Sequence, residues 1–405
     1  MKTSMRGPFI FILGVTFSGF LFSLYYTRSR EIQEPIKPSV LQVKTQQQPQ
    51  VGQSRVITST SKAAPAPPVP QEPVPDKPLP EQPKKPKSTI QKTAEDCNCI
   101  SEKTGKSHNF CYQDPQNETS FGRKFDCGHL KILERLNLVD NPGPFVDLSK
   151  TEENSKQIVF VSAVSDNHFN EATTSIAAFY RFYPNGHFIL YSLGLHEIYT
   201  TNIKKDFHKL EVRTFNVTGY PDYVINWMEY RFKPLILAEV MKEFSNVWWM
   251  DAHIVVKKPM MVELLYNEIA ENVKKAETEV PVPIYFFIHA SHSNYATLFP
   301  EVLNYFPSNS IDLLKSEKKG SQLGANTFFV ARTEYSVEVF KWWILCALDK
   351  TCMAPPGAQV YCSFGDDRNN QFAKCFRFDQ SILNLLMLND FQDHHKYFSK
   401  LGHLF

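Results

Sequence analysis

An aspartate and a histidine interrupt one of the most apolar runs of the sequence. In "NVWWMDAHIVV", residues 246 to 256, Asp251 follows a strand-like run and His253 comes two residues later, before the run resumes. In an extended chain, residues at i and i+2 point to the same side. A carboxylate and an imidazole that face one way can share a divalent cation, and the imidazole suits Mn²⁺ better than Mg²⁺. The structural alternative is that Asp251 caps the strand end and His253 packs beside it.

Other chemically capable residues stand at predicted helix starts or strand ends. "CFRFDQSILNLL" (375–386) places Asp379 and Gln380 at a helix start. Either Asp379 caps that helix, or the pair binds sugar hydroxyls and assists proton transfer. In "YRFKPLIL", Lys233 stands near a helix N-terminus, where a cation is unfavourable and a bound diphosphate would offset it; a solvated lysine is the alternative. His289 and His292 follow a further strand and could contact a metal or an acceptor, or could simply be hydrogen-bonded.

The elements that must position these residues alternate between strand and helix. Predicted strands cover 157–165, 187–194, 209–217, 247–256, 282–290 and 324–332, and predicted helices cover 170–183, 234–244, 260–276, 335–348 and 379–390. This order predicts an α/β fold with a mainly parallel sheet and helices on both faces. Ligands of such sheets bind beyond the carboxyl ends of the strands, where Asp251 stands. A cation there would bridge the phosphates of a nucleotide-sugar and stabilise the leaving diphosphate.

The N-terminal quarter of the chain has a different composition. Residues 7 to 26 carry no charge, and 20 such residues match the length of a membrane-spanning helix, with a cleaved signal peptide as the alternative. Residues 31–95 hold 13 of the 27 prolines and no aromatic residue, which predicts an extended stalk. We therefore divide the chain into a cytoplasmic tail and anchor (1–30), a stalk (31–95), a cysteine-bearing segment (96–150) and a catalytic domain (151–405). The net charge of +2 argues against a nucleic-acid partner.

All eight cysteines lie after the predicted anchor, which favours an oxidising lumen for the body of the protein. The first four, with His129, allow either two disulfides or a zinc site; they are Cys97, Cys99, Cys111 and Cys127. The last four allow three pairings, of which local pairing would join Cys346 to Cys352 and Cys362 to Cys375. Two glycosylation sequons, at Asn117 and Asn216, lie on the same side of the anchor.

Several motifs together resemble a known family. "FVSAVSDNHFNEA", "GHFILYSLGL", "YRFKPLILAE", "VWWMDAHI", "LGANTFFVAR", "CALDKTCMAPPGA" and "CFRFDQSILNLL" look like an uncharacterised glycosyltransferase-like family expanded in nematodes, over about residues 95–405. The chain departs from the family pattern at Phe376, where the family has a histidine, and at Ala252 and His253, where it has small polar residues.

The resemblance implies a GT-A-like sheet and a nucleotide-sugar donor. In such a sheet the first strand ends near the nucleotide, so Ser165 and Asn167 would contact uracil and ribose, with a helix cap as the alternative for Asn167. Lys233 or Arg377 would neutralise the phosphates. Asp379 would then orient the donor or acceptor.

These observations predict a type II, single-pass membrane protein of the Golgi or another secretory membrane, with a lumenal body. It would use Mn²⁺ to move a sugar from a UDP-linked donor to a glycan or glycoprotein. One alternative is a catalytically silent, membrane-tethered glycan-binding protein on the same fold. Another is a zinc-dependent lumenal protein built on the first four cysteines.

Overall fold

The computed structural model describes residues 94–275 and 282–405. The predicted anchor, and the predicted stalk as far as residue 93, lie outside these residues. In the described part, none of the helices combines the length and the apolar character needed to cross a bilayer.

A six-stranded sheet forms the centre of the domain. Its strands are β5 (Ile158–Val164), β6 (His187–Ser192), β7 (Leu210–Thr214), β8 (Asn246–Met250), β9 (Ile284–Ser293) and β10 (Ser321–Ala331), in the order β7-β6-β5-β8-β10-β9. The first four strands of this order are parallel, and β10 runs antiparallel to both β8 and β9. The mainly parallel α/β sheet predicted from the sequence is therefore present. The strand order reverses between β5 and β8, and such a switch point opens a crevice beyond the carboxyl ends of the strands.

Alternating side chains of a strand pack into two separate hydrophobic cores, one on each face of the sheet. Val159 and Val161 of β5 pack in one core with helices α6, α9 and α11, whereas Phe160 packs in the other with α4 and α7. This alternation follows from the two-residue period of a strand, and it explains why β8 is buried at every position.

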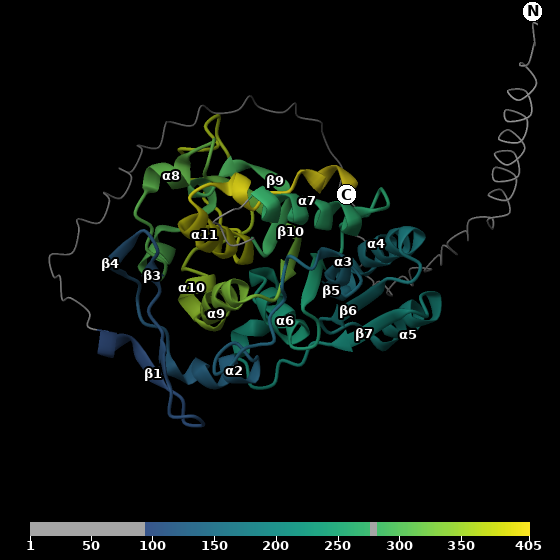
Figure 1. Cartoon of the computed structure of the whole chain (residues 1–405), viewed down its shortest axis with the longest axis horizontal. Helices are drawn as coiled ribbons and strands as arrows, with labels where there is room; N and C mark the ends of the chain where they lie inside the picture. The colour runs from purple at the N-terminus through teal and green to yellow at the C-terminus, as the bar shows by residue number, and fades with distance from the viewer. Residues whose placement is uncertain (1–93, 276–281) are drawn as a thin grey trace, which may run out of the picture. The chain divides into compact units, whose positions relative to one another are not determined.

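The helices occupy both faces of the sheet and its two ends. The larger ones are α4 (Phe169–Phe182), α5 (Glu197–Asp206), α6 (Phe232–Met241), α7 (Met261–Lys275), α9 (Glu334–Leu348) and α11 (Asp379–Phe391). Figure 1 shows α9, α10 (Lys350–Met353) and α11 gathered at the end of the domain that holds β9 and β10, and α4 and α5 at the end that holds β6 and β7. The short helices α2 (Leu130–Arg135), α3 (Thr151–Ser155) and α8 (Ile311–Lys315) lie in the connections.

The cysteine-bearing segment packs into the domain. It forms two small hairpins, β1 (Asn98–Ile100) with β2 (Ser107–Asn109) and β3 (Gln113–Asp114) with β4 (Asn117–Phe121). Phe110, Tyr112 and Phe125 of this segment share a core with Phe306 and Trp342.

All eight cysteines form disulfides, which leaves no thiolate for the zinc site considered above. The first four pair as Cys97–Cys111 and Cys99–Cys127. The local pairings Cys346–Cys352 and Cys362–Cys375 are confirmed.

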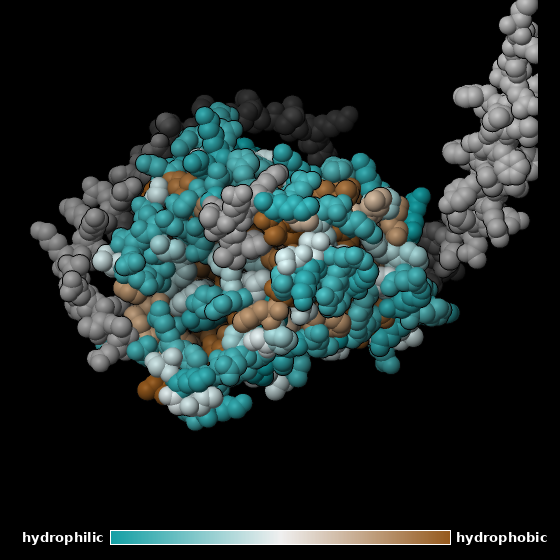
Figure 2. Space-filling model, in the orientation of Figure 1, coloured by the Kyte–Doolittle hydropathy of each residue, from teal (hydrophilic) through white to brown (hydrophobic). Residues whose placement is uncertain are grey.

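The face of the described part that Figure 2 shows is largely hydrophilic, with apolar side chains visible between the polar ones. Asn117 and Asn216 are both exposed, so each sequon is accessible for the predicted glycosylation.

Candidate functional site

Asp251 lies one residue beyond the end of β8. Its backbone N–H donates to Asn326 of β10, and the chain then turns, with the N–H of Ile254 donating to the Asp251 carbonyl. The expected extended conformation of residues 251 to 253 is therefore wrong, because β8 leaves the sheet in a turn at this point. Asp251 and His253 nevertheless line the same two cavities.

Lys233, on the first turn of α6, lies between two carboxylates. Its ammonium is 3.1 Å from Asp251 Oδ1 and 2.9 Å from Asp379 Oδ2, and it donates to the Ala325 carbonyl at 3.0 Å. An ammonium has three N–H donors, so these three contacts use all of them. Lys233 is also only 2 % exposed. Its three N–H groups are therefore all engaged in this arrangement, and the binding of donor phosphates by Lys233 stays a prediction.

The protonation states of Lys233 and Asp379 follow from burial and from the charges next to them. Burial alone would lower the pKa of Lys233, but the carboxylates of Asp251 and Asp379 outweigh burial and raise it. Burial raises the pKa of Asp379 to about 6, against the opposing effect of Lys233 and with a contribution from the neighbouring Asp251 charge. One cation between two anions carries a net negative charge, so the trio takes up one proton on Asp379 more readily than an exposed aspartate would.

A strained backbone presents Asp379 to Lys233. Phe378, the residue before α11, has φ 42° and ψ −114°, and Tyr230, three residues before Lys233, has φ 53°. Side chains with a Cβ rarely adopt positive φ, and such strain clusters at functional sites. Asp379 is the first residue of α11, and the residue in the cap position is Phe378. The alternative that Asp379 caps the helix is therefore wrong, since its carboxylate binds Lys233.

Gln380 is held by the backbone and by another glutamine. Its Oε1 accepts from the N–H of Ala325, and its Nε2 donates to Gln322 Oε1 at 2.7 Å. One N–H of its amide remains for a ligand. The structure thus makes Gln380 an anchored donor rather than a proton-transfer group.

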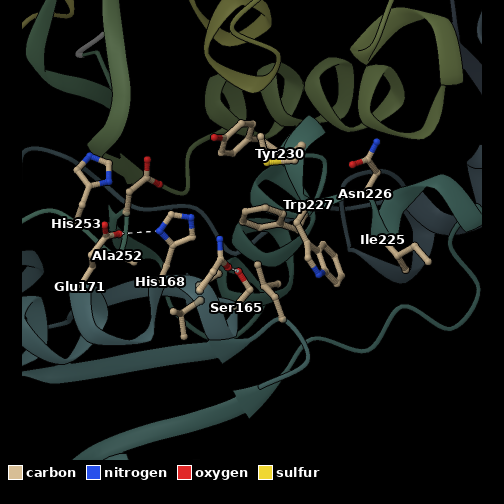
Figure 3. A pocket seen from close by; sticks show the side chains of 16 residues that line it. Ser165, His168, Glu171, Ile225, Asn226, Trp227, Tyr230, Ala252 and His253 are labelled. Carbon is tan, nitrogen blue, oxygen red and sulfur yellow. Dashed lines mark hydrogen bonds and ion pairs between the residues drawn. The ribbon is translucent and has the colours of Figure 1, made fainter. Parts of the chain in front are cut away.

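A first lobe of the cleft, of about 470 Å³, opens at the switch point between β5 and β8. Ser165 and Asn167 line it after β5, and Ser165 donates to Asn167 at 2.7 Å. Figure 3 shows Trp227, Tyr230 and Asn226 facing His168, Glu171 and His253 across this lobe. Asn167 forms no helix cap, whereas Asp166 accepts a hydrogen bond from the backbone N–H of His196 and so ties this loop to the start of α5.

A second lobe, of about 340 Å³, lies on the other side of Asp251. Tyr230, Asp251 and His253 line both lobes, whereas Lys233, Asp379, Gln380 and Arg377 line only the second. The predicted donor-binding residues are thus divided between the lobes. His292 lines the second lobe and His289 lines neither.

A divalent cation at Asp251 and His253 would have few protein ligands. Asp251 Oδ1 already accepts from Trp249 Nε1 at 2.6 Å and from Lys233, so Oδ2 and the exposed imidazole of His253 are the atoms left. One or two protein ligands suffice where substrate phosphates complete the coordination. The residues therefore fit an ion held jointly with a diphosphate. Within residues 94–275 and 282–405, the only trio of side chains close enough to hold an ion unaided is Asp393, His394 and His395, which lines neither lobe.

Sequence reasoning missed Trp227, Tyr230, Asn326, Phe364 and Arg368. Trp227 could have been noticed from the sequence, since it is one of only five tryptophans. The others reach the cleft through a strand pairing or a loop that no local pattern predicts.

Comparison with protein families gives one match. Residues 97–238 match the family described as "Protein of unknown function (DUF1647)", which confirms the expected resemblance to an uncharacterised family. None of the curated proteins searched matches this sequence.

Solved structures similar to this chain include several glycosyltransferases. The galactosyltransferase LgtC, in complex with donor and acceptor sugar analogs, is 13% identical over 56% of this chain and 70% of its own, with a TM-score of 0.31. Core-mannan synthase A from Aspergillus fumigatus, in its Mn/GDP form, is 11% identical over 59% and 71%, with a TM-score of 0.37. The mannosyltransferase Ktr4p from S. cerevisiae is 13% identical over 55% and 71%, with a TM-score of 0.32. All three scores lie below 0.5, so the functional proposal below rests on the cleft itself.

Proposed function

We propose that the protein transfers a sugar from a nucleotide-diphosphate donor to a glycan or glycoprotein acceptor. The observation that carries this proposal is the position of Asp251. It stands between two lobes at the carboxyl end of β8, beside the switch point of the sheet. A donor with a flat base, a charged linker and a sugar needs one lobe for each end and a charged residue between them.

The first lobe suits the nucleoside. Trp227 and Tyr230 offer aromatic faces to a base, and Ser165 and Asn167 offer hydrogen-bonding groups to base and ribose. The diphosphate would then lie at Asp251 and His253. A divalent ion held there, with Mn²⁺ as our candidate, would neutralise charge on the leaving diphosphate.

The second lobe suits the transferred sugar and the acceptor. Asp379, with its pKa near 6, is largely ionised at pH 7 and accepts a hydrogen bond from a sugar hydroxyl. Gln380 donates its remaining N–H. Lys233 positions both carboxylates, since it binds each of them within 3.1 Å.

The four disulfides and two exposed sequons support a body that matures in an oxidising compartment. We therefore retain the proposal of a type II protein of the Golgi or another secretory membrane, anchored through residues 7–26.

The test is a screen of nucleotide-sugars for Mn²⁺-dependent donor hydrolysis, in which UDP-linked donors are expected to react. Asp251→Asn should abolish the reaction, and Asp222→Asn, outside the cleft lining, should leave it unchanged. Turnover that is indifferent to metal and to Asp251→Asn would contradict the proposal.

A catalytically silent glycan-binding protein remains the second candidate. The observation that favours it is the pairing of both cleft carboxylates with Lys233, which reduces the charge available to a metal. It predicts glycan binding without UDP binding or donor hydrolysis in the same screen.

A further inference from the structure

The second lobe contains two arginines whose charge no carboxylate balances. Arg368 and Arg377 both line it, and neither forms an ion pair within the described residues, 94–275 and 282–405. The two carboxylates of this lobe, Asp251 and Asp379, are both bound to Lys233. Three cationic and two anionic side chains therefore leave the lobe with a net charge of +1 when both carboxylates are ionised.

Arg368 is fixed in place before any ligand binds. Its Nε donates to the Ser291 carbonyl at 2.9 Å, and its guanidinium carbon lies 4.0 Å from the centre of the Phe364 ring. The side chain of Ser293 also binds the neighbouring Asn369 carbonyl at 2.6 Å. These contacts hold the arginine against the end of β9, and the two terminal nitrogens of its guanidinium donate to no other described residue. An immobilised, planar pair of donors matches a carboxylate or a sulfate.

The loop that carries these residues is closed by a disulfide. Cys362 and Cys375 are joined across a separation of 13 residues, with Phe364 and Arg368 inside the closed loop and Arg377 just beyond it. The bond therefore restrains the loop that carries Arg368 and also holds Cys375, two residues before Arg377, and both arginines line the second lobe. Pre-ordering of this kind reduces the entropy lost when a ligand binds.

His292 lines the same lobe as the two arginines. Burial, and then the charges of Arg377 and Arg368, lower the pKa of this imidazole to about 4. Its Nδ1 lies 3.0 Å from the Ser293 carbonyl. His292 is therefore neutral, and adds no charge to the pair.

We propose that the acceptor recognised by the second lobe carries an anionic group, such as the carboxylate of a uronic acid, which Arg368 and Arg377 bind. This inference rests on the proposed function, because it assigns the second lobe to the acceptor. It also changes the earlier assignment of Arg377, which shares no lobe with Ser165 and Asn167.

The test compares two probes that differ only at one carbon, 4-nitrophenyl β-D-glucuronide and 4-nitrophenyl β-D-glucoside. Binding of each to the full-length protein in detergent is measured by calorimetry or by ligand-observed NMR. The glucuronide should bind at least tenfold more tightly than the glucoside, and its advantage should shrink as salt increases. Arg368→Gln and Arg377→Gln should each remove most of the advantage, and Arg368→Lys should retain part of it.

Arg181→Gln, an exposed arginine of α4, is the matched control and should leave the preference unchanged. Arg368 is itself exposed, so its substitution tests the idea without unfolding the domain. Equal affinity for the two probes would overturn the inference, as would a preference that survives both glutamine variants.

A competition with UDP separates the acceptor from the donor. Glucuronide binding should persist at saturating UDP and Mn²⁺. Displacement by UDP would assign the arginines to the donor diphosphate and overturn the inference while leaving glycosyl transfer intact. Conversely, a glucuronide preference in a protein that hydrolyses no nucleotide-sugar would contradict the proposed function alone.

Discussion

Lys233→Met tests the central feature of the cleft, the ammonium between two carboxylates. Methionine keeps much of the aliphatic volume and removes the charge, which leaves Asp379 buried at 3 % exposure without a cation. Removing one partner of a buried pair costs about 3–5 kcal/mol. Asp379 can instead take up a proton, and because its pKa in the folded protein is already about 6, protonation costs about 1.4 kcal/mol at pH 7 and almost nothing at pH 5. The loss of unfolding free energy that arises from Asp379 is therefore limited to about 1.4 kcal/mol at pH 7 and falls to nearly zero at pH 5.

Chemical denaturation at both pH values measures this loss. Lys341→Met is a matched control, because Lys341 is also buried but its partner Glu338, 3.0 Å away, has a side chain that is 56 % exposed. That substitution should cost less than about 1 kcal/mol at either pH. The double variant Lys233→Met/Asp379→Asn should recover most of the stability lost at pH 7, since no carboxylate is left buried and unpaired there. A loss that is the same at pH 5 and pH 7, or a double variant no more stable than the single one, would refute this account.

Four further predictions follow from the same contacts. Asp251→Asn retains an acceptor for Trp249 and leaves Lys233 paired with Asp379, so the melting temperature should change by less than about 2 °C. Calorimetry should nevertheless show that the Mn²⁺-dependent affinity for UDP falls more than about tenfold. Normal UDP binding together with a lowered melting temperature would contradict the metal role. Because the pKa of Asp379 is about 6 in the folded protein and lower in the unfolded chain, the free energy of unfolding should fall as pH rises from about 4 to 6. The kcat/KM for donor hydrolysis should fall as pH drops through about 6, because Asp379 is then protonated. Asp379→Asn should lack this decrease at low pH. Replacing Cys362 and Cys375 by serine should cost about 3 kcal/mol on unfolding and weaken glucuronide binding, and unchanged binding would show that the loop keeps its shape without the bond. Protease treatment of sealed microsomes should leave the body intact and glycosylated, and its digestion would place it in the cytoplasm.

Lys233 lies near a helix start, and its partners lie far from it in the sequence. Its type and its place near a helix start predicted an electrostatic cost that some anion must offset. The anions are two side chains of the protein itself, one 18 residues and the other 146 residues further along the chain. The local sequence predicts the electrostatic cost of Lys233, whereas only the tertiary structure brings Asp251, after β8, and Asp379, at the start of α11, to its ammonium.

The same distinction applies to Asp251. The apolar run before it predicted a buried strand, and β8 is buried at every residue. Whether residues 251 to 253 continue that strand depends on where β10 stops pairing, which is a long-range event. The turn that results keeps Asp251 and His253 at one cleft, though not by the same-side spacing of a strand.

Local sequence patterns predicted the alternation of strands and helices, because side-chain burial has a period of two residues in a strand and 3.6 in a helix. For the last four cysteines the sequence allowed three pairings and favoured the local one, since cysteines close in sequence meet at little entropic cost, and the structure confirms that pairing. Tertiary structure alone decided the antiparallel direction of β10, the pairing of Lys233 with Asp251 and Asp379, and the arrival of Arg368 in the second lobe. Each of these joins segments far apart in the chain, and their energies depend on burial and on distances between charges, which no local pattern of residues specifies.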